Sequence, residues 1–194
     1  MFEGLWESFI LLFVVFDAIG NVPIFYSLTM SMTAEERNKA FKVSTIVAGS
    51  LLVFFALLGW SLFSFYGTGF EDLEIAGGLL LLLLAIEGVL GRVEAETLRS
   101  EDVSIVPMAT PLLAGPGSIY TVIYLSQIYG EIQTLISIIA NTLLAFIILK
   151  FSDIMLRKLG RNLILVFSRI MSFVLAVIAV SMLREGVITV LRSL

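Results

Sequence analysis

The sequence has 194 residues, of which 59% are hydrophobic and 14% are charged; its net charge is −4 and its mean hydropathy is +1.04. Soluble domains are about 45–50% apolar and about 25% charged, so this composition is typical of a protein embedded in lipid. The absence of Cys and His excludes disulfides, thiolate chemistry, metal sites built on these residues, and nucleophilic pairs that need them.

Six segments are apolar and about long enough to cross a hydrocarbon core, which takes about 20 residues in a helix. They run from Leu5 to Met30, Phe41 to Tyr66, Leu73 to Leu90, Val103 to Tyr129, Ile132 to Leu149, and Leu163 to Leu183. Thr33 and Glu36 have the spacing of a capping box before the second segment. Gly160 and Asn162 are typical of a break before the sixth. The sequence therefore predicts an all-α membrane protein with six transmembrane helices.

Basic residues occur in alternate loops. The first, third and fifth loops contain Arg37, Lys39, Lys42, Arg92, Arg99, Lys150, Arg157, Lys158 and Arg161. The second loop, Gly67 to Asp72, and the fourth, around Gly130, contain none. Loops rich in Lys and Arg stay in the cytoplasm, so both termini are expected outside it. Arg184 and Arg192 near the C-terminus are the exceptions to this pattern.

The polar stretch from Gly91 to Asp102 divides the chain into two halves of three spans each. We expect one transmembrane domain, 1–194, built from a first repeat, 1–95, and a second repeat, 96–194. The first half starts outside and the second starts inside, so the two repeats would be inverted. Inverted repeats related by an axis in the membrane plane are the plan of many secondary transporters.

The first helix of each half contains a cluster of residues that break helices. The first cluster includes Asp17, Gly20, Asn21 and Pro23, and the second includes Thr110, Pro111, Gly115, Pro116, Gly117 and Ser118. Gly adds backbone freedom, and Pro removes a hydrogen-bond donor. One such motif alone is usually a simple kink. Two at matched positions of inverted halves predict a transport site near the middle of the membrane.

A helix that restarts inside the membrane presents unbonded N–H groups and a positive dipole end, which suit an anion. Pro116 and Pro23 are suited to the first turns of such half-helices. Asp17 is the acidic residue that we place near the middle of a span, where it can bind an ammonium group, Na⁺ or a proton. The alternative role for Asp17 is to cap the break.

Thr110 and Asn141 are polar residues that can complete the site, although an isolated Asn in a span is more often a link between helices. Gly77 and Gly78 are expected to allow close helix packing. An anion site beside a carboxylate suits a zwitterion such as an α-amino acid, and it also suits an inorganic anion or a polar solute.

Several segments resemble the MarC family, which is also described as a neutral amino acid transporter family. They are Asp17–Phe25, Ala34–Lys39, Ile75–Leu79, Val106–Pro111, Ala114–Ile119 and Ser168–Met171, so the resemblance covers essentially the whole chain. It implies six spans, a multi-pass protein of a prokaryotic plasma membrane, and transport of small neutral amino acids such as glycine or alanine. Many relatives have Pro directly after the Asp, whereas this chain has Ala18, which would soften the first break.

The expected function is therefore secondary active transport of small neutral amino acids, coupled to Na⁺ or H⁺. The alternatives are a channel for a small polar solute and an intramembrane enzyme acting on a lipid phosphate. Neither broken motif contains the Arg or Lys that a phosphate site needs, so we expect no enzyme. The chain has no G-x-x-x-x-G-K-[ST] motif. The expected partners are the amino acid, its coupling ion and the lipid bilayer, with no cofactor and no nucleic acid.

Overall fold

The computed structural model describes residues 2–90 and 113–193. Within these ranges the regular secondary structure consists of helices joined by short turns. The helices are α1 (Phe2–Phe16), α2 (Val22–Leu28), α3 (Ala34–Phe65), α4 (Phe70–Leu90), α6 (Pro116–Ile128), α7 (Glu131–Lys150) and α8 (Ser152–Ser193). The expectation of an all-α protein is confirmed for the described part of the chain.

Four of these helices, α3, α4, α7 and α8, are long and apolar enough to cross a membrane. They correspond to the second, third, fifth and sixth predicted spans. Only 22–33% of the residues in their most apolar windows are buried inside the protein. Most of this apolar surface therefore faces outward, as it does in proteins whose surroundings are lipid.

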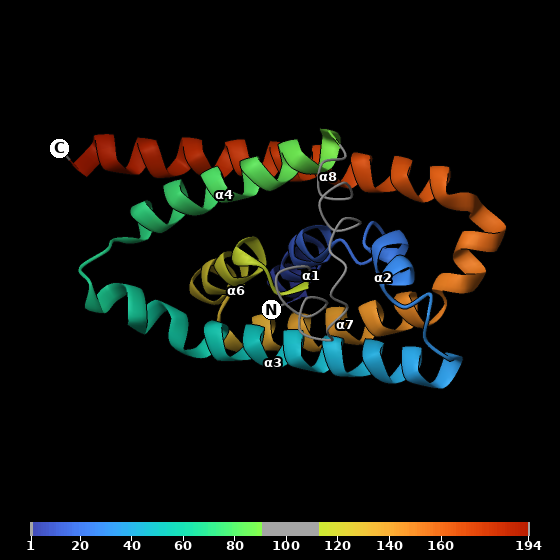
Figure 1. Ribbon diagram of the computed structural model, residues 1–194. Coiled ribbons are helices and arrows are strands. Elements are labelled where there is room, and N and C mark those ends of the chain that lie inside the picture. Colours follow the sequence, from blue (N-terminus) through green and yellow to red (C-terminus); the bar gives the residue numbers. More distant parts are fainter. Residues whose placement is uncertain (1, 91–112, 194) are drawn as a thin grey trace.

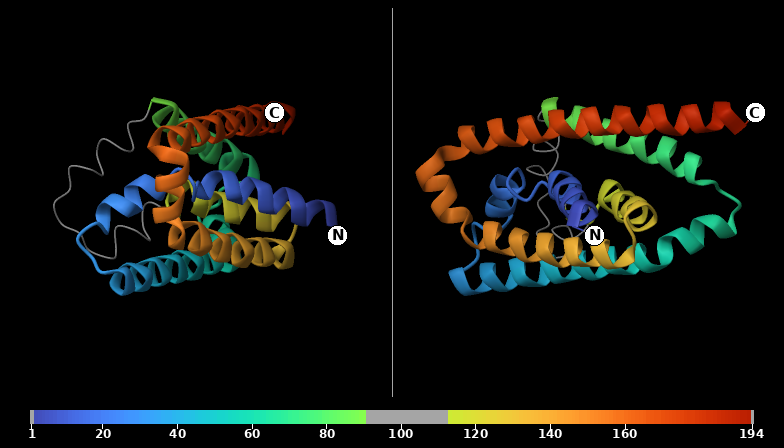
Figure 2. Two further views of the ribbon diagram at one scale, coloured as in Figure 1. Left: turned by 90° about the vertical axis from the view of Figure 1, so that its right-hand side faces the viewer. Right: turned by 180° about the vertical axis from the view of Figure 1, so that it is seen from behind.

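The helices form three layers (Figure 1). The pair α3 and α7 makes one outer layer, and the pair α4 and α8 makes the other. Helices α1, α2 and α6 lie between the two pairs, and the view from behind shows the same order (Figure 2). The central layer supplies buried residues to the main core cluster, among them Leu12, Phe16, Phe25 and Val122. The short helices are thus the protected interior of the molecule.

Glycines allow the helices to approach closely, as predicted for Gly77 and Gly78. A Cβ atom on Gly77 would collide with the Tyr120 ring of α6, and one on Gly78 would lie 2.8 Å from Cγ of Leu183 in α8. Farther along α8, Gly186 would meet the first turns of α4 in the same way. Residue numbers rise along α8 as they fall along α4, so the two helices run antiparallel.

Two helix boundaries differ from the predicted spans. The α3 helix begins at Ala34, seven residues before the predicted Phe41, because the expected capping box is present: Thr33 Oγ1 accepts from Glu36 N at 3.3 Å, and Glu36 Oε2 accepts from Thr33 N at 2.8 Å. The α8 helix ends at Ser193, beyond the predicted Leu183. The predicted break before the sixth span is present, because Gly160 has non-helical φ and ψ of 75° and 156° and kinks the helix that begins at Ser152. The predicted sixth span stopped at Leu183 because charged residues follow it and lower the hydropathy. A helix can continue through such residues where they are exposed.

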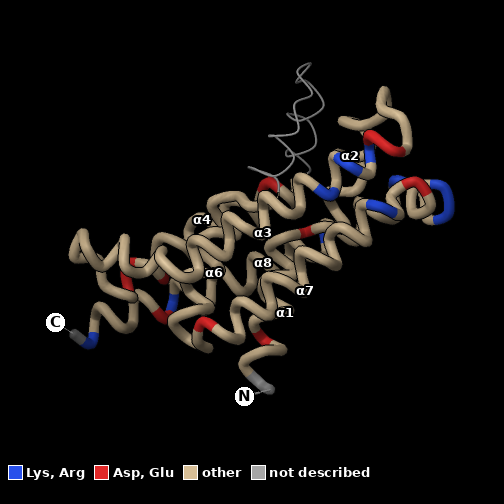
Figure 3. Tube along the Cα trace, turned by 90° about the horizontal axis from the view of Figure 1, so that it is seen from below, with Lys and Arg blue, Asp and Glu red and all other residues tan. Residues whose placement is uncertain are grey.

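Charges are distributed unevenly along the molecule (Figure 3). Lys and Arg gather at the end that contains α2, the start of α3, and the junction of α7 and α8, which we call the basic end. Its basic residues are Arg37, Lys39, Lys42, Lys150, Arg157, Lys158 and Arg161. Both termini lie at the opposite end (Figure 3). Arg92 and Arg99 of the predicted third loop lie outside the described residues.

Candidate functional site

The predicted first span is broken, and the break lies between α1 and α2. The helix α1 ends at Phe16, and Asp17 has a φ of 39°, in the left-handed region that residues other than Gly rarely adopt. The chain then turns tightly, with Asn21 N donating to Asp17 O at 3.0 Å and Val22 N donating to Ile19 O at 3.1 Å. The break forms although Ala18 stands where many relatives have proline.

The side chain of Asp17 is half-buried and is held from two directions. Gly20 N donates to Asp17 Oδ1 at 3.2 Å, and the Ser168 hydroxyl of α8 donates to Asp17 Oδ2 at 2.8 Å. The first hydrogen bond lies within the turn and stabilises it. The second links the turn to α8, near the other end of the chain. The carboxylate is therefore fixed in the interior of the helix bundle.

Gly20 has a physical reason to be glycine. A Cβ atom at this position would collide with both the Asp17 carboxylate and the Ser168 hydroxyl. The sequence identified Gly20 as a helix breaker, and the structure adds that the missing side chain leaves room for a contact between α8 and the turn.

Asn21 lies at the N-cap of α2, but its side chain does not cap that helix as expected. Its Nδ2 atom instead donates to Phe16 O at 3.3 Å. This carbonyl lies at the end of α1, where the break removes its helical partner, and a buried carbonyl needs another donor. Pro23 is buried in the first turn of α2, which is only seven residues long.

The second break is described from Leu113 onward, so the predicted site residues Thr110 and Pro111 lie outside the described residues. Gly115 is the N-cap of α6, with φ −82° and ψ 176°, an extended conformation open to any residue. Pro116 is the first residue of the helix, as predicted. Ser118 is buried and its hydroxyl donates to Leu113 O at 2.9 Å, which bridges the break.

The two breaks lie next to each other. A Cβ atom on Gly117, in the first turn of α6, would lie 3.8 Å from Cγ1 of Val15, in the last turn of α1. Ala18 of the first break and Leu113 of the second belong to the same buried cluster. The last turn of α1, which ends just before Asp17, thus lies against the first turn of α6.

Asn141 lies elsewhere. Its Nδ2 atom donates to Ser137 O at 2.9 Å in its own helix, and to Phe9 O of α1 at 3.2 Å. Phe9 precedes Asp17 by eight residues, or about 12 Å along a helix. These bonds fit the alternative role of a link between helices. Its Oδ1 atom is buried without a hydrogen-bond partner in the described part of the chain.

Ser168 is the contact that the sequence analysis missed as a site residue. Two features of the sequence could have identified Ser168. It begins Ser168–Met171, one of the segments that carry the family resemblance, and its hydroxyl lies in an otherwise apolar helix. Among residues 2–90 and 113–193, no group of three or more Asp or Glu side chains is placed to hold a metal ion.

Comparison with known proteins gives consistent matches over the full chain. The profile described as MarC family integral membrane protein matches residues 2–191. The UPF0056 membrane protein MJ1677 of Methanocaldococcus jannaschii is 33% identical over 192 residues, covering 93% of this chain and 94% of the relative. The UPF0056 membrane protein YvbG of Bacillus subtilis is 32% identical over 200 residues, covering 96% and 95%. No solved structure matches the chain. The expected resemblance to the MarC family is confirmed. The names of these relatives describe membrane proteins and specify no substrate.

Proposed function

The chain belongs to the MarC family of integral membrane proteins, and from this premise we propose that it is a secondary transporter of small neutral amino acids. The observation that carries the proposal is the Asp17 carboxylate, held in a turn between two half-helices and tied to α8 by Ser168. A carboxylate inside a membrane span costs several kcal/mol, so a span that keeps one is a candidate for ligand or ion binding.

Backbone strain at the same position supports this reading. The positive φ of Asp17 costs about 1–3 kcal/mol, and such strain tends to occur at binding sites and switch regions. Asp tolerates this conformation better than most residues because its short side chain can bond locally, as it does to Gly20 N, so the conformation also serves the turn. We therefore assign Asp17 a functional role in addition to its role in the turn.

The adjoining start of α6 offers the complementary chemistry. The first N–H groups of a helix and its dipole favour an anion, and Pro116 is suited to this first turn. A zwitterionic α-amino acid carries its ammonium and carboxylate groups on the same carbon atom. It therefore matches a site in which a carboxylate lies next to a helix N-terminus. We assign the substrate ammonium to Asp17 and the substrate carboxylate to the first turn of α6.

The pairing of the long helices supports two inverted repeats, 1–95 and 96–194. The second helices of the two halves, α3 and α7, lie together, with Gly49 close to Thr142. Arg37, near the start of α3, pairs with Asp153, which follows the end of α7. The third helices, α4 and α8, form the other pair. Both pairs run antiparallel, which a two-fold axis in the membrane plane requires. In this arrangement each half contributes one broken helix to the central layer, which completes six spans.

The uneven charge distribution supports an orientation with the basic end in the cytoplasm and both termini outside it. For a prokaryotic chain this membrane is the plasma membrane. We assign Na⁺ or H⁺ as the coupling ion, because a single carboxylate is suited to a single positive charge and the described residues contain no group of three acidic side chains placed for a metal ion.

Uptake of labelled glycine and alanine into proteoliposomes, with and without Na⁺ and pH gradients, tests the proposal. Wild-type protein should show ion-driven uptake and saturable counterflow, which a channel does not give. Asp17→Asn should abolish ion-driven uptake. Glu74→Gln is the matched control, because it removes a buried carboxylate of α4 that lies beside Gly186, toward the far end of α8. Normal ion-driven uptake by the Asp17→Asn protein would contradict the proposal.

A further inference from the structure

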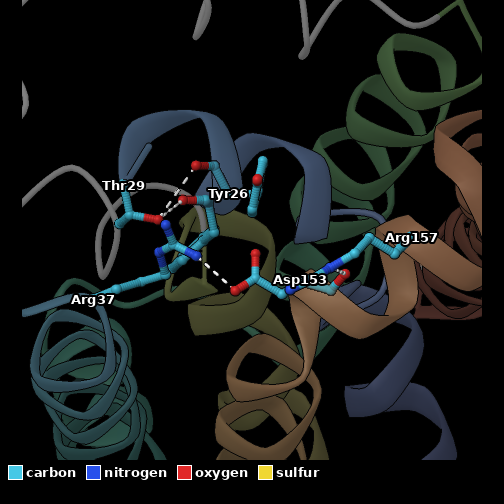
Figure 4. A network of polar contacts seen from close by, with 6 residues as sticks. Tyr26, Thr29, Arg37, Asp153 and Arg157 are labelled. Carbon is cyan, nitrogen blue, oxygen red and sulfur yellow. Dashed lines mark hydrogen bonds and ion pairs between the residues drawn. The ribbon is translucent and has the colours of Figure 1, made fainter. Parts of the chain in front are cut away.

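One arginine joins three helices at the basic end (Figure 4). Arg37, in the first turn of α3, forms a 2.8 Å ion pair through Nη1 with Oδ2 of Asp153, in the first turn of α8. Its guanidinium carbon lies 5.2 Å from the centre of the Tyr26 ring of α2. We call these three residues the Arg37 clasp.

The ion pair of the clasp is partly buried. The Arg37 side chain is 15% exposed and that of Asp153 is 37% exposed. The Nε atom of Arg37 is buried and has no hydrogen-bond partner in the described part of the chain. A partly buried ion pair is screened less than a surface pair, and removing one partner leaves an uncompensated charge. The clasp therefore couples the positions of α2, α3 and α8.

The helix that the clasp holds is short and has a joint at each end. The helix α2 has seven residues and follows the turn in which Asp17 has its positive φ. It ends at Thr29, whose hydroxyl donates to Phe25 O at 2.8 Å and to Tyr26 O at 3.3 Å. A rigid piece between two non-helical joints is the geometry of a hinged element.

A cleft of about 310 Å³ lies between this helix and α8. The cleft is lined by Pro23, Ile24, Tyr26, Ser27 and Met30 from α2 and the turn after it, and by Leu156 and Arg161 from α8. Tyr26 belongs to both the clasp and the cleft, so the open space adjoins the clasp between α2 and α8.

We propose that α2 is the gate at the basic end of the substrate path and that the Arg37 clasp holds it closed in this structure. The inference rests on the proposed transport function, because a gate implies a path to Asp17. When Arg37 and Asp153 separate, α2 turns toward the cleft and leaves α3. The tilted ring pair Phe25 and Phe41, whose ring centres are 6.0 Å apart, then separates and opens the interior.

Cysteine labelling tests the gate, and the natural chain has no cysteine to interfere. Ala40 lies on α3 one turn after Arg37, belongs to the same buried cluster as Phe25, and is 2% exposed. We expect Ala40→Cys to react slowly with a charged maleimide in the purified full-length protein. Adding Arg37→Gln or Asp153→Asn should accelerate the reaction roughly tenfold, the scale of a typical conformational coupling. The charge-reversed pair Arg37→Asp with Asp153→Arg should slow it again.

Ala179→Cys is the control for general unfolding, since Ala179 is 0% exposed and packs against α4 toward the other end of α8. It should stay slow in every background. Unchanged labelling at Ala40, or an equal acceleration at Ala179, overturns the gate. Labelling needs no substrate, so a gate that opens in a protein that does not bind glycine or alanine refutes only the proposed substrate class.

Discussion

The hydroxyl of Ser168 donates a 2.8 Å hydrogen bond to Oδ2 of Asp17, which precedes it by 151 residues. This bond connects α8, the last helix of the chain, to the turn that interrupts the first span. Hydrogen bonds to a charged group are roughly twice as strong as those between neutral groups. The position of the carboxylate therefore depends on the position of α8.

Ser168→Ala should lower the initial rate of glycine or alanine uptake about tenfold, because a hydrogen bond to a charged group contributes about 1.5–3 kcal/mol. Ser172→Ala is the matched control, one helical turn farther along α8. The Ser172 hydroxyl donates to Ser168 O at 3.0 Å, within its own helix, so its loss should leave uptake within about twofold of wild type. Equal uptake by the two variants would contradict the role of Ser168.

Gly20→Ala should impair both folding stability and transport. The added methyl group would collide with the Asp17 carboxylate and the Ser168 hydroxyl, and overpacking of this kind costs about 1–3 kcal/mol. Thermal unfolding in detergent and uptake in proteoliposomes measure the two effects. Gly69→Ala is the control, because the nearest atoms there belong to the flexible Glu71 side chain. A Gly20→Ala protein with wild-type stability would show that the turn tolerates the methyl group.

Local chemistry explains which features could be predicted from the sequence. The break at Asp17 and Gly20 follows from residues that lie close together in the chain. The capping box of Thr33 and Glu36 is likewise a pattern of four residues. The close approach at Gly77 is a property of small residues in membrane helices. Each of these is encoded within one or two helical turns.

The contacts that were missed join distant parts of the chain. Ser168 lies 151 residues from Asp17, and Arg37 lies 116 residues from Asp153. Their pairing depends on how the helices are layered, which a single sequence does not specify. Asn141 shows the same limit, because its polarity suggested the site, whereas its bond to Phe9 O depends on the neighbour of α7.

Asn141→Leu should separate the two roles considered for this residue. If the side chain only links α7 to α1, stability should fall by about 0.6–1.7 kcal/mol, the range measured for hydrogen bonds between membrane helices. Glycine and alanine should then still raise the apparent melting temperature, as ligands of a folded state do. Loss of that stabilisation in a folded Asn141→Leu protein would instead place Asn141 in the binding site.

The contact between Gly77 and Tyr120 should be essential for the position of α6. Gly77→Ala would push a methyl group into the Tyr120 ring, so we expect a loss of about 1–3 kcal/mol, seen as a lower melting temperature in detergent. In a Tyr120→Ala background the same substitution should cost much less, because the ring that it strikes is gone, and the difference is the coupling energy of the pair.

Ala76→Leu is the control for adding bulk to α4, since Ala76 faces outward and should tolerate the larger side chain. An equal cost of Gly77→Ala in both backgrounds would mean that the ring does not limit the approach of α4 and α6. The first turn of α6 would then be positioned on α4 by Gly117, which lies against Leu81 and Leu84, rather than by Tyr120.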